Sequence, residues 1–137
     1  MSSLVLTGDT SGQVTLAAPA VAGTTTLTLQ ATTGTVALQS DGLGFSQTYQ
    51  DVTASRTIGT TYTNSTGKPI FVSWYGTNSA LSGVAYGQVG GVTIARSTGV
   101  ASSAGAIALT FIVPPSATYT VAQGTAVSTT TNWFELR

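Results

Sequence analysis

The chain of 137 residues contains no cysteine and no histidine, and only 6% of its residues are charged. An average domain carries about 25% charged residues. Without histidine the chain lacks the commonest general base and the imidazole ligand of metal sites. Without cysteine it lacks a thiolate nucleophile, a zinc–thiolate cluster and any disulfide. We therefore expect neither enzyme activity nor a bound metal or cofactor.

Charge of either sign is scarce, since four basic residues balance four acidic ones. Four basic residues do not make a surface that follows a phosphate backbone, which argues against nucleic acid as a partner. The carboxylates are Asp9, Asp41, Asp51 and Glu135. They are too scattered to predict a glycosidase pair or a calcium site. Arg56 and Arg96 stand alone in predicted strands, where we expect them to be solvated or to pair between subunits.

Long apolar runs are also missing, although 42% of the residues are hydrophobic. The uncharged stretches 10–40 and 97–134 are interrupted by threonine, glycine and proline. No run of 18 apolar residues exists, so a membrane-spanning helix is not expected. The opening residues MSSLVLTGD lack the basic segment of a secretory signal, and we expect the protein to be made in the cytoplasm.

Threonine and serine replace the missing charge, with 27 and 15 copies. Gly12, Gly23 and Gly34 are spaced eleven residues apart, and each precedes a run in which threonine alternates with leucine or valine. The runs are 14–16, 25–29 and 35–38. This period of two is typical of half-buried strands. Three short strands are marginal alone, so we expect them to stack on identical chains or, as an alternative, on the C-terminal part of the same chain.

Turn-forming residues divide the chain after this repeat. The sequence Ser40-Asp-Gly-Leu-Gly44 has two glycines within three residues, which permits a hinge or a change of direction. We predict a repeat segment over 1–40, a glycine hinge over 41–44 and a head domain over 45–137.

The head domain reads as a series of short strands separated by turns. We predict strands at 56–63, 70–75, 84–89, 92–97, 106–113, 118–123 and 131–136. Gly90-Gly91 fits a two-residue hairpin, because glycine tolerates positive φ. In 70–75 both faces are apolar, with Trp74 on one and Tyr75 on the other, which indicates a central strand or a subunit contact. The sequence therefore predicts an all-β fold with an antiparallel β-sandwich head of about seven strands.

Two local motifs are dismissed on their context. Gly67-Lys68 lacks the earlier glycine and the following serine or threonine of a phosphate-binding loop, because Tyr62 and Pro69 stand there. Asn64-Ser-Thr66 is a formal glycosylation acceptor, but no secretory signal accompanies it.

Binding residues are sought among aromatic and amide side chains, which offer apolar area with a polar handle. Tyr75, Asn78 and Tyr86 are the candidate receptor-binding residues, and the loops 76–83 and 98–105 are the candidate binding loops. Trp74 alternates with Ile70 and is assigned to the core instead.

Two parts of the chain resemble bacteriophage tail fibre proteins. The segment from Thr10 to Leu38 resembles one common just before the terminal domain of such fibres. Four further segments are similar to the C-terminal head domain of tail fibres: Tyr49–Arg56, Tyr62–Ile70, Phe111–Tyr119 and Trp133–Arg137. One departure is Ser116, which stands where that head has glycine in the Pro-Pro turn.

The resemblance implies a trimeric virion fibre whose head binds a glycan or an outer-membrane protein on the bacterial surface. The N-terminal segment would then intertwine three chains and dock on another virion protein of the tail, baseplate or capsid. Scarcity of charge independently favours a trimer, because exposed β-edges normally carry protective charges or proline. An alternative is a capsid decoration or head-fibre protein with no essential receptor. A short polysaccharide depolymerase is a third reading, disfavoured by the missing catalytic groups.

Overall fold

The structure is a computed structural model. It describes residues 3–7, 10–17, 20–21, 23–24, 26, 41–78, 83–99 and 105–137. Packing divides the chain into two units, Met1–Thr35 and Val36–Arg137. This division falls a few residues before the end predicted for the repeat segment, among residues that are not described.

The described part of the N-terminal unit contains an antiparallel hairpin of β1 (Ser3–Thr7) and β2 (Gln13–Ala17). Strand β2 confirms the prediction for 14–16, and Gly12 before it has a φ of +81°. Strand β1 was not predicted, because its short Leu-Val-Leu run shows no alternation. The predicted strands 25–29 and 35–38 lie outside the described residues, Thr26 apart.

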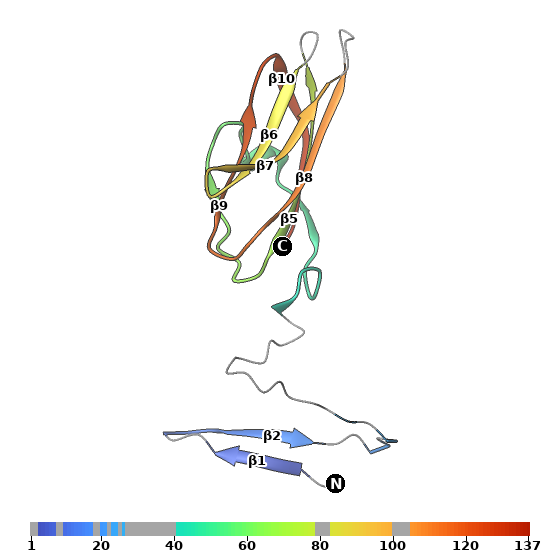
Figure 1. Cartoon of the computed structure of the whole chain (residues 1–137), viewed down its shortest axis with the longest axis vertical. Coiled ribbons are helices and arrows are strands. Elements are labelled where there is room, and N and C mark those ends of the chain that lie inside the picture. Colours follow the sequence, from blue (N-terminus) through green and yellow to red (C-terminus); the bar gives the residue numbers. More distant parts are fainter. Residues whose placement is uncertain are drawn as a thin grey trace. The chain divides into compact units, whose positions relative to one another are not determined.

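The head is built from two four-stranded antiparallel sheets that pack face to face (Figure 1). Its elements are β3 (Tyr49–Asp51), the 3₁₀ turn η2 (Thr53–Ser55), β4 (Tyr62–Thr63), β5 (Ile70–Asn78), β6 (Val84–Val89), β7 (Val92–Thr98), β8 (Ala106–Val113), β9 (Thr118–Gln123) and β10 (Val127–Leu136). The strand orders are β3-β10-β5-β8 and β4-β9-β6-β7. Consecutive strands alternate between the sheets except at the β6–β7 hairpin, which is the arrangement of an eight-stranded jelly roll. The all-β fold is therefore as predicted.

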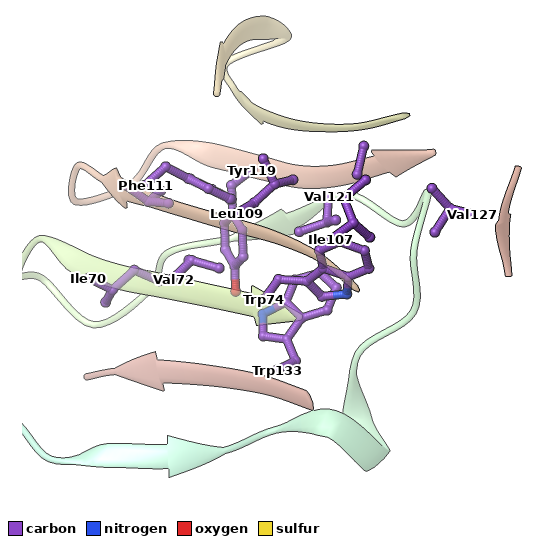
Figure 2. Packing of buried hydrophobic residues seen from close by; sticks show 12 residues of the cluster. Ile70, Val72, Trp74, Ile107, Leu109, Phe111, Tyr119, Val121, Val127 and Trp133 are labelled. Atoms are coloured by element: carbon purple, nitrogen blue, oxygen red, sulfur yellow. The ribbon is translucent and has the colours of Figure 1, made fainter. Parts of the chain in front are cut away.

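Buried and exposed side chains alternate along the strands, which gives each sheet one apolar side to pack against the other. In β8 every second residue is buried, and Ile107, Leu109 and Phe111 face the other sheet. Strand β5 lies between β10 and β8, and its residues Ile70, Val72 and Trp74 are buried as predicted. Figure 2 shows these side chains meeting the residues of the opposite sheet.

Large aromatic side chains fill one part of this core. Trp74 and Trp133 are both buried and lie opposite one another on β5 and β10 (Figure 2). Tyr62 contacts Trp133 edge-on, with ring centroids 6.1 Å apart. Full burial of a large apolar side chain stabilises a fold by about 1.5–3 kcal/mol.

The tight turns follow the glycine chemistry of the sequence. Gly90 and Gly91 join β6 to β7 with φ of +58° and +80°, as a two-residue hairpin with positive φ at both positions requires. Ser116, in the turn after Pro114-Pro115, has a φ of +63°. A glycine at this position would adopt that conformation without strain.

The strand predicted over 56–63 is wrong except at Tyr62–Thr63. The chain instead turns at Thr57–Thr60, where the Thr60 amide donates to the Thr57 carbonyl and Gly59 has a φ of +82°. The prediction also missed β3 and began β10 too late. Strands of two or three residues are too short to show a period.

The predicted hinge at 41–44 lies in a turn that is bonded to the head. Gly44 has a φ of +87°, and its amide donates to Gln47 Oε1 over 2.6 Å. Gln47 Nε2 in turn donates to the carbonyl of Pro69 over 2.8 Å. The last residue of the predicted hinge, Gly44, is therefore tied to the head by hydrogen bonds of the Gln47 side chain.

Candidate functional site

The three predicted binding residues do not form one site. Tyr75 points outward from β5 and is 40% exposed. Tyr86 is half-buried on β6, which belongs to the other sheet. Because the inner faces of the two sheets pack together, these tyrosines lie on opposite outer surfaces of the head. Asn78 is only 3% exposed and offers almost no surface to a ligand.

Asn78 instead supports the bases of the two candidate loops. The backbone amide of Asn78 donates to the carbonyl of Gly105, and the backbone amide of Gly99 donates to the carbonyl of Gly83. A Cβ at Gly83 or Gly99 would lie 2.4 or 2.6 Å from atoms of the Asn78 side chain. The β5–β6 and β7–β8 loops therefore leave the sandwich side by side. Residues 79–82 and 100–104 of these loops lie outside the described residues.

The outer surface of the β3-β10-β5-β8 sheet carries six large apolar side chains beside small and polar ones such as Ser73 and Thr110. Its large side chains, which we call the apolar face, are Tyr49, Phe71, Tyr75, Ile112, Phe134 and Leu136. The register places Leu136 between Tyr49 and Phe71, and Phe71 beside Ile112. Four neighbouring strands thus contribute one continuous apolar row. The apolar residues of β5 opposite its buried side were the sequence signal for this face.

The outer surface of the β4-β9-β6-β7 sheet is mainly polar, although β7 also exposes Val92 and Ile94. Its residues, which we call the polar face, are Tyr86, Gln88, Thr93, Arg96, Thr118 and Thr120. Tyr86 lies opposite Arg96 on β7, and Gln88 Nε2 donates to Thr93 Oγ1 over 3.3 Å. Hydroxyl, amide and guanidinium groups beside one aromatic ring can bind a polar ligand such as a sugar. The sequence nominated Tyr86 but did not place Arg96 beside it.

The N-terminal hairpin also exposes one apolar side. Leu4 pairs with Leu16 and Leu6 with Val14, so alternation puts all four on the same surface. We call them the hairpin face, and each is at least 50% exposed. The opposite surface carries Thr7, Gln13 and Thr15 together with Val5. The hairpin face is therefore the more apolar of the two sides.

The buried charge of the head is centred on Glu135, which is fully buried on β10. Arg56 Nε donates to Glu135 Oε1 over 3.0 Å, and Arg137 Nη1 donates to Oε2 over 2.9 Å. The hydroxyl of Tyr119 donates to Oε1 over 2.6 Å. The guanidinium of Arg56 also lies 4.5 Å from the centre of the Tyr62 ring. The expectation that Arg56 is a lone solvated or subunit-pairing charge is wrong.

These contacts shift two pKa values in opposite directions. Burial opposes ionisation of Glu135, but hydrogen bonds from Arg56 and Tyr119 and the nearby positive charges outweigh it and lower its pKa. Burial, followed by the hydrogen bond to Glu135 and its charge, raises the pKa of Tyr119. Glu135 is thus a buried carboxylate held by three side chains, Arg56, Tyr119 and Arg137.

The remaining carboxylates of the described ranges were compared with the pattern of a metal site. No cluster of three carboxylates that could hold a metal ion is found there. Asp51 is exposed, and hydrogen bonds from the side chain and amide of Thr53 lower its pKa.

The glycosylation acceptor Asn64 is an internal turn residue. It is 1% exposed, and its Nδ2 donates to the carbonyls of Lys68, Val113 and Pro114. Its Oδ1 accepts from Thr66. The side chain is therefore fully engaged in the fold.

Comparison with known proteins identifies no relative. No family model, no curated protein and no solved structure matches this chain. Among the described residues, no helix has the length and apolar character needed to span a membrane.

Proposed function

We propose that this chain is a fibre-type virion protein that assembles through its N-terminal hairpin and binds a bacterial surface receptor through its head. The main support for this proposal is the exposed hairpin face. Leu4, Leu6, Val14 and Leu16 form an exposed apolar surface on a two-stranded hairpin. A two-stranded hairpin is only marginally stable in water, so it needs a further layer to cover its apolar side.

Identical chains are the partner that fits this surface best. Every copy presents the same apolar side, and closed symmetric assembly buries all of them without open-ended aggregation. The resemblance to tail fibres favours an assembly of three chains. Two-sheet jelly rolls are used by viral capsid and lectin domains, which suits a surface-binding head. Fold alone does not define function, so the receptor role rests on the resemblance and on the polar face.

Light scattering of the full chain tests the assembly. We expect a mass of three chains of 13.8 kDa at micromolar concentration. Leu16→Asp places a charge in the hairpin face and should dissociate the assembly. Thr15→Asp, on the neighbouring position of the opposite surface, should leave it intact. A stable monomer of the unaltered chain contradicts the proposal.

Labelling of intact particles separates the receptor role from a purely structural one. An antibody against this chain should bind at the tail if the chain is a tail fibre. Binding to the capsid, with adsorption unaffected by the antibody, favours the decoration protein instead.

A further inference from the structure

We infer that Arg96 on the polar face binds the acid group of a bacterial surface polysaccharide, and that Tyr86 beside it contacts the sugar ring. The inference rests on the proposed function and deepens it, because it names the chemical class of the receptor. The acid group is a carboxylate or a phosphate, since a guanidinium recognises both by the same paired hydrogen bonds.

The use of positive charge in the fold singles out Arg96. The chain has four cationic residues. Arg56 and Arg137 donate to the buried carboxylate of Glu135, and Lys68 Nζ donates to a backbone carbonyl over 3.2 Å. In the part of the chain that the structure describes, Arg96 is the one cation whose side chain makes no hydrogen bond or ion pair, and it is exposed on β7. Its guanidinium is therefore available to a ligand.

The surroundings of Arg96 contain no counter-charge. It is the only charged residue in the four strands of its sheet. Asp51 lies on β3 in the other sheet, and Glu135 is buried on β10. The position opposite Arg96 on β6 is taken by Tyr86. An exposed arginine without a counter-ion presents its N–H donors in a planar fork, which matches an acid group.

The neighbours of Arg96 suit a sugar. Because Tyr86 lies directly opposite, the Cβ atoms of the two residues are about 5 Å apart. The Tyr86 ring packs toward β9, where a Cβ at Gly124 would lie 2.9 Å from Cε2, and so leaves the guanidinium on β7 uncovered. Gln88 and Thr93, paired on the same face, add an amide and a hydroxyl. Such groups exchange hydrogen bonds with sugar hydroxyls, while the aromatic ring contacts the apolar side of the sugar.

A polymer with a repeated acid group is the ligand that this small site fits. One guanidinium and one ring per chain bind weakly on their own, and salt screens an exposed charge beyond about 8 Å. An acidic polysaccharide offers the same group in every repeat, so several assembled copies can bind it at once. Avidity then raises the overall affinity without any new contact.

The edge position of β7 offers a second use for Arg96. Strand β7 lies at the edge of its sheet and also exposes Val92 and Ile94, and a charge on such an edge discourages pairing with other chains. Edge protection is indifferent to the acid group of a ligand. A comparison of acidic and neutral forms of one ligand therefore separates the two uses.

Matched polysaccharides test the inference. The probe is surface polysaccharide purified from a strain that the labelled full chain binds. It is used intact, after reduction of its carboxyl groups to alcohols, and after removal of its phosphate groups. We expect one of the two treatments to weaken binding of the native chain by about tenfold or more, and this treatment identifies the acid group.

Two variants assign the effect to Arg96. Arg96→Gln should bind the intact polymer about as weakly as the native chain binds the treated one, and should not distinguish the two forms. Lys68→Gln removes the same charge from the turn before β5 and should bind as the native chain does. Light scattering and the fluorescence of buried Trp74 and Trp133 verify that each variant is assembled and folded.

The other outcomes overturn the inference in distinguishable ways. If neither treatment weakens binding, or if Arg96→Gln still distinguishes the two forms, the inference fails and the receptor role stands. Binding to cells but not to their purified polysaccharide has the same meaning and indicates a protein receptor. An Arg96→Gln chain that no longer assembles assigns the arginine to contact between copies instead. A native chain that binds no strain of a panel contradicts the receptor role itself.

Discussion

The hydroxyl of Tyr119 on β9 donates a 2.6 Å hydrogen bond to Oε1 of Glu135 on β10, and so joins the two sheets of the head through the core. The same carboxylate accepts from Arg56 and Arg137. In a chain with only 6% charged residues, three of them meet at this one buried point. The cluster fixes the chain before β4 and the C-terminus to the sandwich.

Replacing Glu135 with glutamine should destabilise the head strongly. The change leaves two arginines without their anion in a region from which water is largely excluded. Breaking a buried ion pair in this way costs about 3–5 kcal/mol. Urea unfolding followed by tryptophan fluorescence measures the loss. Asp51→Asn, at an exposed carboxylate, is the control and should change little. Equal stability of the two variants contradicts the structural role of Glu135.

The lowered pKa of Glu135 predicts a loss of stability in acid. The folded state favours the ionised form, so its contribution is fully present above the ordinary pKa of 4.5 and is lost as the pH falls through the lowered value. Unfolding midpoints between pH 7 and pH 2 should fall in the native chain and change less in Glu135→Gln. Parallel curves for the two proteins would show that other groups govern the acid response.

The stability of the head should be sensitive to replacing a single atom of the Asn64 side-chain amide. Asn64→Asp replaces the Nδ2 donor, which meets three carbonyl oxygens, by an acceptor that repels them. Loss of these bonds and burial of an unsatisfied group should cost about 3 kcal/mol or more. Asn132→Asp, at a half-buried position on β10, is the matched control and should cost much less. Thermal unfolding of both variants measures the two losses of stability. An Asn64→Asp chain as stable as the native one contradicts the structural role of the Asn64 side chain.

The positive φ of Ser116 predicts that replacing this residue by glycine stabilises the head. Its φ of +63° lies in the left-handed region, which costs a residue with a side chain about 1 kcal/mol or more. Ser116→Gly removes this strain but adds freedom to the unfolded chain, so we expect a net gain of about 0.5 kcal/mol. Ser97→Gly, within β7, should instead destabilise the head. The melting temperatures of the two variants should therefore move in opposite directions.

How far the sequence predicts the structure depends on the distance over which each signal acts. Strands β8 and β9 alternate over six or more residues, and their predicted bounds match. The hairpin at Gly90-Gly91 is likewise a local signal. Strands β3 and β4 have two or three residues, too few to show any period.

The buried cluster shows the limit of local patterns. Arg56 and Glu135 are separated by 79 positions, and each looks like an isolated surface charge in the sequence. Their pairing depends on the order of the strands, which the sequence did not provide. The same holds for the polar face, because only the register of β6 and β7 brings Arg96 opposite Tyr86. The apolar face was partly predictable, since Phe71 and Tyr75 alternate with a buried set on one strand.

The proposed receptor role assigns cell binding to the polar face. Tyr86 lies there with Arg96, and its ring packs against the backbone at Gly124, where a Cβ would lie 2.9 Å from Tyr86 Cε2. Because the ring is held in place, it can anchor a ligand at little entropic cost. Tyr86→Ala should lower the affinity of the labelled full chain for bacterial cells by about tenfold, the scale of a binding hot spot. Flow cytometry over a panel of strains provides the measurement. Tyr75→Ala, on the apolar face, is the matched control and should leave the affinity of assembled chains unchanged, and the reverse pattern would transfer the receptor site to the apolar face.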